Sequence, residues 1–313
     1  MQKMERLRKF IALVLAVVLF VTATLPSAQA ACIFDDWKIG KNKKYTVSDT
    51  LQSELNRLYN RYDFSIGWGV YDISGKKLKT VATRNSAKSY QSNCTIKAPM
   101  LMYICQKMDK GELSLSTKLS VNTSKLHYTD FGNKSGKYTV EYLLRRMINV
   151  SNNACYEVFL RYVTRSKFNS FLSSLGSGTV ITSYNYMGNC TVQDRAVEWF
   201  ELYKYCHSGA AHASHAWSLL TNAQYSPIRD GLGCTVAHKS GWHYEEGVRG
   251  TAGDCAVVKA KNGGCYLMIM FTKNNARAKY SEKLMRELAV ILNKVWNEYY
   301  ADLPKRQKKT AAF

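Results

Sequence analysis

The stretch Cys94-Thr95-Ile96-Lys97 places a nucleophilic side chain three residues before a lysine, and the apolar run 98–105 follows it directly. If a helix includes these positions, Cys94 and Lys97 share a face one turn apart. An amine at that distance can take the proton of a thiol or stabilise its thiolate. Nucleophile-x-x-lysine is frequent by chance, so its meaning depends on two later stretches, Ser151-Asn152-Asn153 and Lys239-Ser240-Gly241.

Residues 1–30 have the three parts of a secretory signal. Basic residues come first, an apolar stretch follows, and Ala28-Gln29-Ala30 is a small-x-small cleavage site. An uncleaved membrane anchor is the alternative, but an apolar stretch of about 15 residues is shorter than a bilayer span requires. Gln29 stands where a lipobox has an aliphatic residue, which disfavours a lipid anchor on Cys32. We therefore expect a secreted protein that is cleaved after Ala30.

The chain is strongly basic, with a formal net charge of +21. Residues 1–30 hold four basic residues and one acidic residue, so cleavage lowers this charge by three, to +18. For an exported protein this favours anionic neighbours, such as cell-wall polymers or a membrane surface, although a merely solubilising surface is the alternative. Basic residues are spread along the chain and no nucleic-acid motif is present, so DNA and RNA are not expected as partners.

All nine cysteines lie after residue 30. An oxidising compartment permits disulfides, and the odd count leaves at least one thiol unpaired within a monomer. We expect the protein to be a monomer. No Cys-x-x-Cys pair and no His-Glu-x-x-His motif occurs, so neither a metal nor another cofactor is indicated.

Periodic patterns divide the 313 residues into strands and helices. Strands are predicted over residues 64–73, 78–84, 235–240, 251–260 and 266–272. Helices are predicted over residues 48–61, 97–110, 140–148, 154–163, 165–175, 192–206, 213–223 and 280–300. Asn262-Gly263 is a strong signal for a hairpin turn between the last two strands.

This order predicts an α+β fold, an α/β sandwich in which early and late strands join in one five-stranded antiparallel sheet flanked by the terminal helices. The middle of the chain becomes an inserted all-helical subdomain. We assign residues 45–90 and 226–300 to the sheet part, residues 91–225 to the helical part and residues 301–313 to a basic tail, in which residues 305–309 are expected to be disordered. A cleft is expected where the two parts meet.

Three short motifs resemble the signature of the serine β-lactamases and penicillin-binding proteins, nearest to the class A β-lactamases. That signature is Ser-x-x-Lys, then Ser-Asp-Asn, then Lys-Thr-Gly. The corresponding stretches are Cys94-Thr95-Ile96-Lys97, Ser151-Asn152-Asn153 and Lys239-Ser240-Gly241. Their order, their spacing and the layout of strands and helices fit, so the resemblance covers about residues 45–300 and implies a β-lactamase-like catalytic domain.

The resemblance implies a catalytic group of Cys94, Lys97 and Ser151. A helix dipole and the Lys97 charge favour the Cys94 thiolate, and Ser151 is suited to relay a proton to a leaving nitrogen. The backbone N–H groups of Cys94 and Trp242 are candidates for the oxyanion donors.

The substrate-binding residues implied by the resemblance come from the second and third motifs. Asn153 can hold a substrate amide, and Lys239 and Ser240 can attract a substrate carboxylate, with Arg249 adding charge nearby. Gly241 leaves the strand edge bare, so a substrate can lie along it. Trp242 belongs to the same binding edge.

Two departures from the family pattern bear on turnover. The nucleophile of the family is serine, whereas this chain has Cys94, which could also be a disulfide partner or a buried small apolar residue. Class A enzymes also carry a glutamate before the position of Thr191 to activate the deacylating water, and residues 183–190 contain no carboxylate. Asn152 in place of Asp is a smaller departure.

Two functions remain open at this point. One is a secreted acyl-transfer hydrolase that acts on β-lactams or cell-wall peptides through a covalent acyl-enzyme, with a link to antibiotic resistance. The other is a non-catalytic protein of the same fold that binds peptidoglycan-like ligands. Intact Lys97, Ser151 and Lys239 favour the enzyme, whereas Cys94 and the missing glutamate favour the binding protein.

Overall fold

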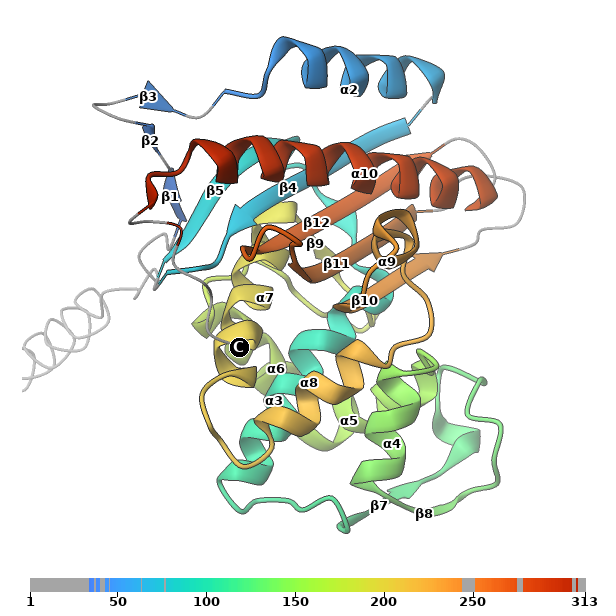
Figure 1. Ribbon diagram of the computed structural model, residues 1–313. Helices are drawn as coiled ribbons and strands as arrows, with labels where there is room; N and C mark the ends of the chain where they lie inside the picture. The colour runs from blue at the N-terminus through green and yellow to red at the C-terminus, as the bar shows by residue number, and fades with distance from the viewer. Residues whose placement is uncertain are drawn as a thin grey trace, which may run out of the picture. The chain divides into compact units, whose positions relative to one another are not determined.

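The structure is a computed structural model (Figure 1). It describes residues 34–36, 38–39, 43–44, 46–62, 64–75, 77–243, 251–274, 278–305 and 308, all of them within the compact unit Ile33–Phe313. The predicted signal sequence, Arg249 and most of the predicted tail lie outside the described residues.

The main sheet has the strand order β1-β5-β4-β12-β11-β10. Five of these strands pair antiparallel, as predicted: β4 (Phe64–Asp72), β5 (Leu78–Arg84), β10 (Val236–His243), β11 (Thr251–Lys259) and β12 (Cys265–Asn274). The short β1 (Phe34–Asp36), which was not predicted, pairs parallel with β5. Strand β10 is therefore left at an edge of the sheet.

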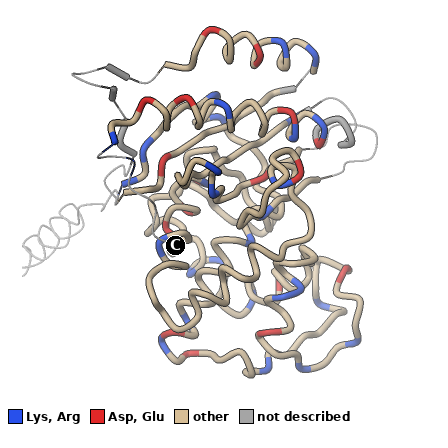
Figure 2. Tube along the Cα trace, viewed as in Figure 1, with Lys and Arg blue, Asp and Glu red and all other residues tan. Residues whose placement is uncertain are grey.

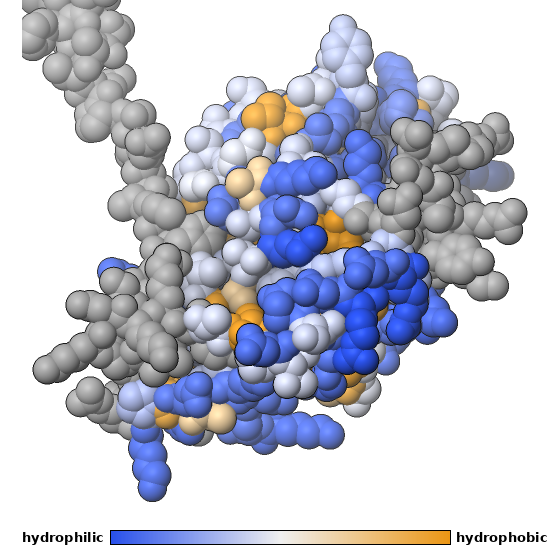
Figure 3. All heavy atoms as spheres, turned by 90° about the horizontal axis from the view of Figure 1, so that it is seen from above, coloured by the Kyte–Doolittle hydropathy of each residue, from blue (hydrophilic) through white to orange (hydrophobic). Residues whose placement is uncertain are grey.

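One face of the sheet is covered by the two predicted terminal helices, α2 (Asp49–Arg61) and α10 (Ala278–Asp302), and by the short α9 (Pro227–Leu232) (Figure 1). The Ser48 hydroxyl caps α2 and also donates to Glu298 of α10 at 2.7 Å, which ties the two helices together. From the side of α2, the outer surface is mostly hydrophilic with isolated apolar side chains (Figure 3).

The other face carries the helical part. Its helices are α3 (Lys97–Asp109), α4 (Val140–Ile148), α5 (Asn153–Val163), α6 (Arg165–Ser174), α7 (Val192–Cys206) and α8 (Ala213–Thr221). Buried side chains lie almost all round α3, because it is packed among the other helices, and one core joins these helices to the sheet residues Leu267 and Phe271.

Short elements that the periodic patterns did not reveal complete the fold. They are β2 (Lys38–Ile39) with β3 (Lys43–Lys44), β6 (Tyr90–Gln91) with β9 (Asn189–Cys190), β7 (Lys118–Val121) with β8 (Gly136–Thr139), and the 3₁₀ turns η1 (Asn93–Ile96) and η2 (Thr123–Lys125). Each has only two to four residues, too few for a hydrophobic period to show.

Lys and Arg residues are distributed along both the sheet part and the helical part of the chain, with Asp and Glu residues among them (Figure 2). The eight described cysteines are free thiols, and Cys32 lies outside the described residues. Among the helices that the structure describes, none is long and apolar enough to cross a bilayer.

Candidate active site

Cys94 lies in the η1 turn, directly before α3. Asn93 adopts a left-handed φ of 48°, a conformation that asparagine tolerates better than most residues. Its amide donates to the backbone oxygen and the hydroxyl of Thr251 at 3.1 and 3.0 Å. These bonds hold the turn against β11, so Cys94 is fixed by the sheet part as well as by its own helix.

Lys97 joins the first two motifs. Its Nζ donates to Cys94 Sγ at 3.2 Å, to Ser151 O at 2.5 Å and to Asn153 Oδ1 at 2.6 Å, and it lies 3.3 Å from Ser151 Oγ. The Cys94 thiol also donates to Asn153 Oδ1 at 3.3 Å. Lys97 is buried, so this amine has no role as a solvated surface charge.

Ser151 lies in a strained turn between α4 and α5, with a left-handed φ of 58°. The next residue, Asn152, caps α5 by accepting from Cys155 N at 2.8 Å. Asp130 accepts from the N–H groups of Asn153 and Ala154 at 2.7 and 2.8 Å. The second motif thus starts a helix and presents a hydroxyl to the cleft at the same time.

Lys239 brings the third motif to the same hydroxyl. Its Nζ donates to Ser151 Oγ at 2.8 Å and to Ser240 O at 2.8 Å, so Ser151 Oγ lies between two lysine amines. A Cβ on Gly241 would lie 2.3 Å from Cys94 N. The edge strand β10 therefore comes so close to Cys94 that only glycine fits there, and the three motifs meet at one point.

Ser240 is oriented differently from what the resemblance implied. Its hydroxyl donates to Tyr225 O at 2.6 Å, and the Tyr225 ring packs against Trp242 at a centroid distance of 4.5 Å. Its single proton is therefore engaged with the segment before α9. Asp254, opposite Ser240 in β11, holds the same segment by accepting from Ser226 Oγ at 2.6 Å, and burial raises the pKa of Asp254 to about 7.

The two lysines shape the ionisation of the cleft. Burial alone raises the pKa of the Cys94 thiol, but the charges of Lys97 and Lys239 and hydrogen bonds from Ser151 and Lys97 outweigh it, so the pKa lies below its ordinary value. Burial lowers the pKa of Lys239 to about 8, although a Cys94 thiolate favours its charged form. The arrangement therefore stabilises a thiolate next to a proton-carrying network.

A model of the Beta-lactamase enzyme family matches residues 50–296. The chain belongs to this family. Its membership supports acyl transfer of the kind performed by β-lactamases and penicillin-binding proteins. No curated protein sequence matches the chain.

Solved structures of β-lactamases and of a penicillin-binding protein share this fold. TLA-1 extended spectrum β-lactamase aligns with a TM-score of 0.69 and 17% identity over 80% of this chain and 99% of its own. A class A β-lactamase from Bacteroides cellulosilyticus DSM 14838 aligns with a TM-score of 0.66 and 17% identity over 79% of this chain and 97% of its own. An acyl-enzyme complex of a PBP-A mutant with penicillin G aligns with a TM-score of 0.66 and 16% identity over 79% of this chain and 96% of its own. At these identities the likeness establishes the fold alone.

The loop that precedes Thr191 lies beside the nucleophile turn, as its place in the family pattern requires. Ser92 N donates to Gly188 O at 3.0 Å, and Tyr156 OH donates to Tyr186 O at 3.0 Å. The loop thus reaches the cleft without bringing a carboxylate.

Carboxylates of the surrounding helical part are engaged elsewhere. Glu198 is buried with Arg195 and accepts from Ser177 Oγ at 2.5 Å, and Glu157 accepts from the backbone N–H groups of the loop before Phe131. Within the described part of the chain, no carboxylate forms an ion pair with Lys97 or Lys239.

Several residues that shape the site were missed by sequence reasoning. Asn93, Asp130, Tyr225 and Asp254 act through contacts between distant parts of the chain, and no local pattern signals them. Tyr128 was considered as a lining residue. Burial and then the Cys94 charge raise the pKa of its phenol.

Proposed function

We propose that the protein is a secreted acyl-transfer hydrolase whose Cys94 attacks the carbonyl carbon of a β-lactam or a cell-wall peptide. The observation that carries this proposal is the position of Lys97 Nζ, 3.2 Å from Cys94 Sγ and in contact with Ser151 and Asn153. The charged and apolar pattern of residues 1–30 and the formal charge of +18 after cleavage support secretion into a wall with anionic polymers.

The acylation step uses the thiolate that the two lysines favour. Sγ forms a bond to the carbonyl carbon, and the resulting oxyanion accepts from the N–H groups of Cys94 and Trp242. When the carbon–nitrogen bond breaks, the nitrogen takes a proton from Ser151 Oγ, which a neighbouring lysine ammonium replaces. The product is a thioester on Cys94 and a free amine, which in a β-lactam remains attached through the opened ring.

We expect the substrate to be bound by hydrogen-bond donors that the contacts among the site residues leave available. Asn153 uses Oδ1 for Lys97 and the thiol, so its Nδ2 is the group for a substrate carbonyl. Lys239 supplies positive charge for a carboxylate, while the Ser240 proton is already donated to Tyr225 O. The bare edge at Gly241 admits an extended substrate.

Hydrolysis of the thioester needs an activated water, and the loop before Thr191 carries no general base. A general base is worth about 10²–10⁴ in rate. We therefore expect acylation to outpace deacylation, so that a long-lived acyl-enzyme accumulates.

The alternative is a protein of the same fold that binds peptidoglycan-like ligands without reacting. The exchange of serine for Cys94 and the loop without a carboxylate favour it. It predicts reversible binding with no covalent product.

Mass spectrometry of the intact protein after incubation with penicillin G, under reducing conditions, separates the two functions. We expect one adduct per chain, mapped by proteolysis to Cys94 and absent from Cys94→Ala. Cys234, which is also partly exposed, supplies the matched control, since Cys234→Ala should label fully. Binding without an adduct would establish the alternative.

A further inference from the structure

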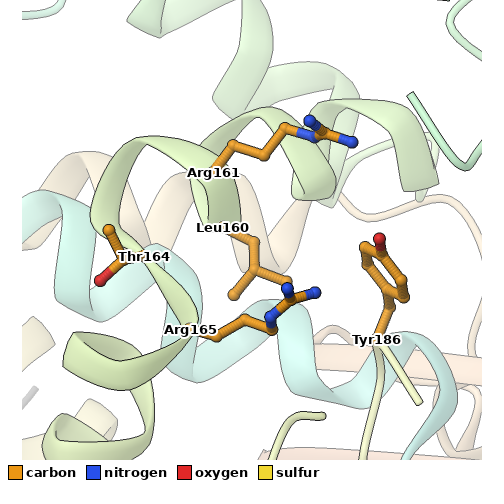
Figure 4. A pocket seen from close by; sticks show the side chains of 5 residues that line it. All are labelled: Leu160, Arg161, Thr164, Arg165 and Tyr186. Atoms are coloured by element: carbon orange, nitrogen blue, oxygen red, sulfur yellow. The ribbon is translucent and has the colours of Figure 1, made fainter. Parts of the chain in front are cut away.

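A pocket of about 420 Å³ lies at the C-terminal end of α5, outside the cleft, and is lined by Leu160, Arg161, Thr164, Arg165 and Tyr186 (Figure 4). We propose that this pocket binds a carboxylate at the far end of a peptide acyl donor whose reacting carbonyl lies at Cys94. The inference rests on the proposed acylation and adds a second, anionic recognition point to the substrate.

Helix α5 leads from the cleft to this pocket. Asn153, which contacts the Cys94 thiol, begins the helix, and Glu157 and Arg161 follow on the same face at intervals of four residues. Eight residues of α-helix rise about 12 Å. Arg161, at the pocket, is thus about 12 Å from Asn153 along the helix axis.

Arg165 supplies a positive charge with no counter-ion. It is exposed, it forms no ion pair with any carboxylate that the structure describes, and its guanidinium lies over the Tyr186 ring at 5.4 Å from the centroid. A guanidinium held against an aromatic face keeps its N–H groups free for a planar anion. Figure 4 shows Arg165 reaching past Leu160 toward Tyr186.

Arg161 contributes a fixed donor on the other side of the pocket. Its Nε donates to Glu157 Oε1 at 2.9 Å, and its Nη2 donates to the same oxygen at 2.7 Å and to Lys125 O at 2.6 Å. Nη1 makes no hydrogen bond to the described residues. Glu157 thus orients the guanidinium and balances much of its charge, while Arg165 supplies the charge that selects an anion.

Tyr186 connects the pocket with the cleft. Its ring stacks on His127 at 4.8 Å and lies edge-on to Tyr128 at 6.0 Å, and the Cys94 charge is one cause of the raised pKa of Tyr128. These three rings form a wall over which an extended peptide can pass from Asn153 to Arg165. Aromatic faces and two guanidiniums suit a peptide backbone that ends in a carboxylate.

The length of the helix defines the length of the ligand. An extended peptide spans about 3.3–3.6 Å per residue. Two residues and a succinyl group therefore place a carboxylate about 11 Å from the reacting carbonyl, close to the distance along α5. A shorter donor should not reach Arg165.

Two unreactive peptides that differ only in charge test the pocket: the amide of succinyl-Ala-D-Ala and the amide of succinamoyl-Ala-D-Ala, which has a neutral end of the same shape. We expect the succinyl peptide to bind about three- to tenfold more tightly in calorimetric titrations, because the pair is charge-assisted but partly exposed. Arg165→Gln should abolish this preference. Lys167→Gln, which removes an equally exposed charge two residues away, should retain it.

Equal affinities of the two peptides for the natural protein would overturn the proposal, as would equal losses in Arg165→Gln and Lys167→Gln, which would indicate only the general basic charge. The thioesters of the same peptides test the proposed function separately. If neither thioester acylates Cys94, the proposed acylation is wrong, while the comparison of the amides still decides the pocket.

Discussion

The two sides of the cleft differ in what they bring to Cys94. The side formed by α3, the turn before α5 and the edge strand β10 brings two lysine amines within hydrogen-bonding distance of the Ser151 hydroxyl, and one of them, Lys97, contacts Cys94. The side formed by residues 183–190 makes equally direct contact with the nucleophile turn, but through backbone groups and without a carboxylate. The groups that the proposed acylation uses are present, and residues 183–190 lack the carboxylate that class A enzymes use for deacylation.

If the proposed acylation is correct, the difference means that a shared fold can retain one half of a two-step reaction independently of the other. Attack on a carbonyl depends on Cys94, its lysine neighbours and two backbone donors, all fixed by the sheet and α3. In the family pattern, hydrolysis depends on one side chain of the loop before Thr191, and in this chain that loop also contributes Met187 and Cys190 to the core. The experiments below address each side in turn.

The largest effect is expected on the acylating side, from Lys97→Met. Removal of the amine leaves the Cys94 thiol without its main stabilising charge, and Ser151 keeps only Lys239 as a lysine partner. We expect acylation of Cys94 by penicillin G to slow by about 10²–10⁴-fold. Rates come from quenched samples analysed by mass spectrometry, with the exposed Lys110→Met at the end of the same helix as the control. A loss of less than threefold would mean that Lys97 does not activate the thiol.

A somewhat smaller effect is expected from Gly241→Ala. The added Cβ would lie 2.3 Å from Cys94 N, so β10 must move away and the oxyanion donors separate. Loss of one such donor costs about 10²–10³ in rate. Gly75→Ala, where a Cβ meets nothing within 4 Å, serves as the control in the same assay. Unchanged acylation in Gly241→Ala would place the oxyanion elsewhere.

The pH dependence of acylation should reflect the positive charges of the two lysines beside Cys94. The thiolate fraction rises with pH and, because the pKa of Cys94 is lowered, the rate should approach its maximum below the ordinary thiol pKa. Above the Lys239 pKa of about 8, that amine loses its charge and the rate should fall severalfold. Lys239→Arg, which stays charged, should lack the falling limb in the same pH–rate profile. A fall near pH 8 that persists in this variant would assign the limb to another group.

The smallest effect is expected from Cys94→Ser and tests the side of the cleft formed by residues 183–190. Cys94→Ser restores the family nucleophile but leaves residues 183–190 without a carboxylate. Steady-state hydrolysis of penicillin G should therefore stay within about tenfold of the natural protein, because the missing base is worth about 10²–10⁴. Spectrophotometric turnover measurements provide the comparison. An increase of several hundredfold in Cys94→Ser would show that the cysteine, and not the loop, limits turnover.

The sequence predicted best those features that local periodicity and motifs define. Helices α4 and α7 have their predicted bounds, because Thr139 and the Thr191–Asp194 capping box mark where each apolar period begins. The three motifs likewise predicted that Cys94, Ser151 and Lys239 lie close together, because the order and spacing of the motifs match those of the family.

Contacts between distant loops could not be predicted in this way. The Ser240 hydroxyl is oriented by its hydrogen bond to the backbone oxygen of Tyr225, 15 residues earlier. The backbone N–H of Asn153 is fixed by the carboxylate of Asp130. The pairing of β6 with β9 involves two residues on each strand, which is too short for any periodic signal. These features arise from tertiary packing and have no local signature.

The imbalance between the two sides is tested most directly by the time course of a single reaction between the protein and excess penicillin G. We predict a burst of one β-lactam opened per chain, coincident with full occupancy of Cys94 by mass, followed by a steady state at least about a hundredfold slower, in line with the loss of a general base. Linear, rapid turnover from the first moment with Cys94 largely unoccupied would contradict the account.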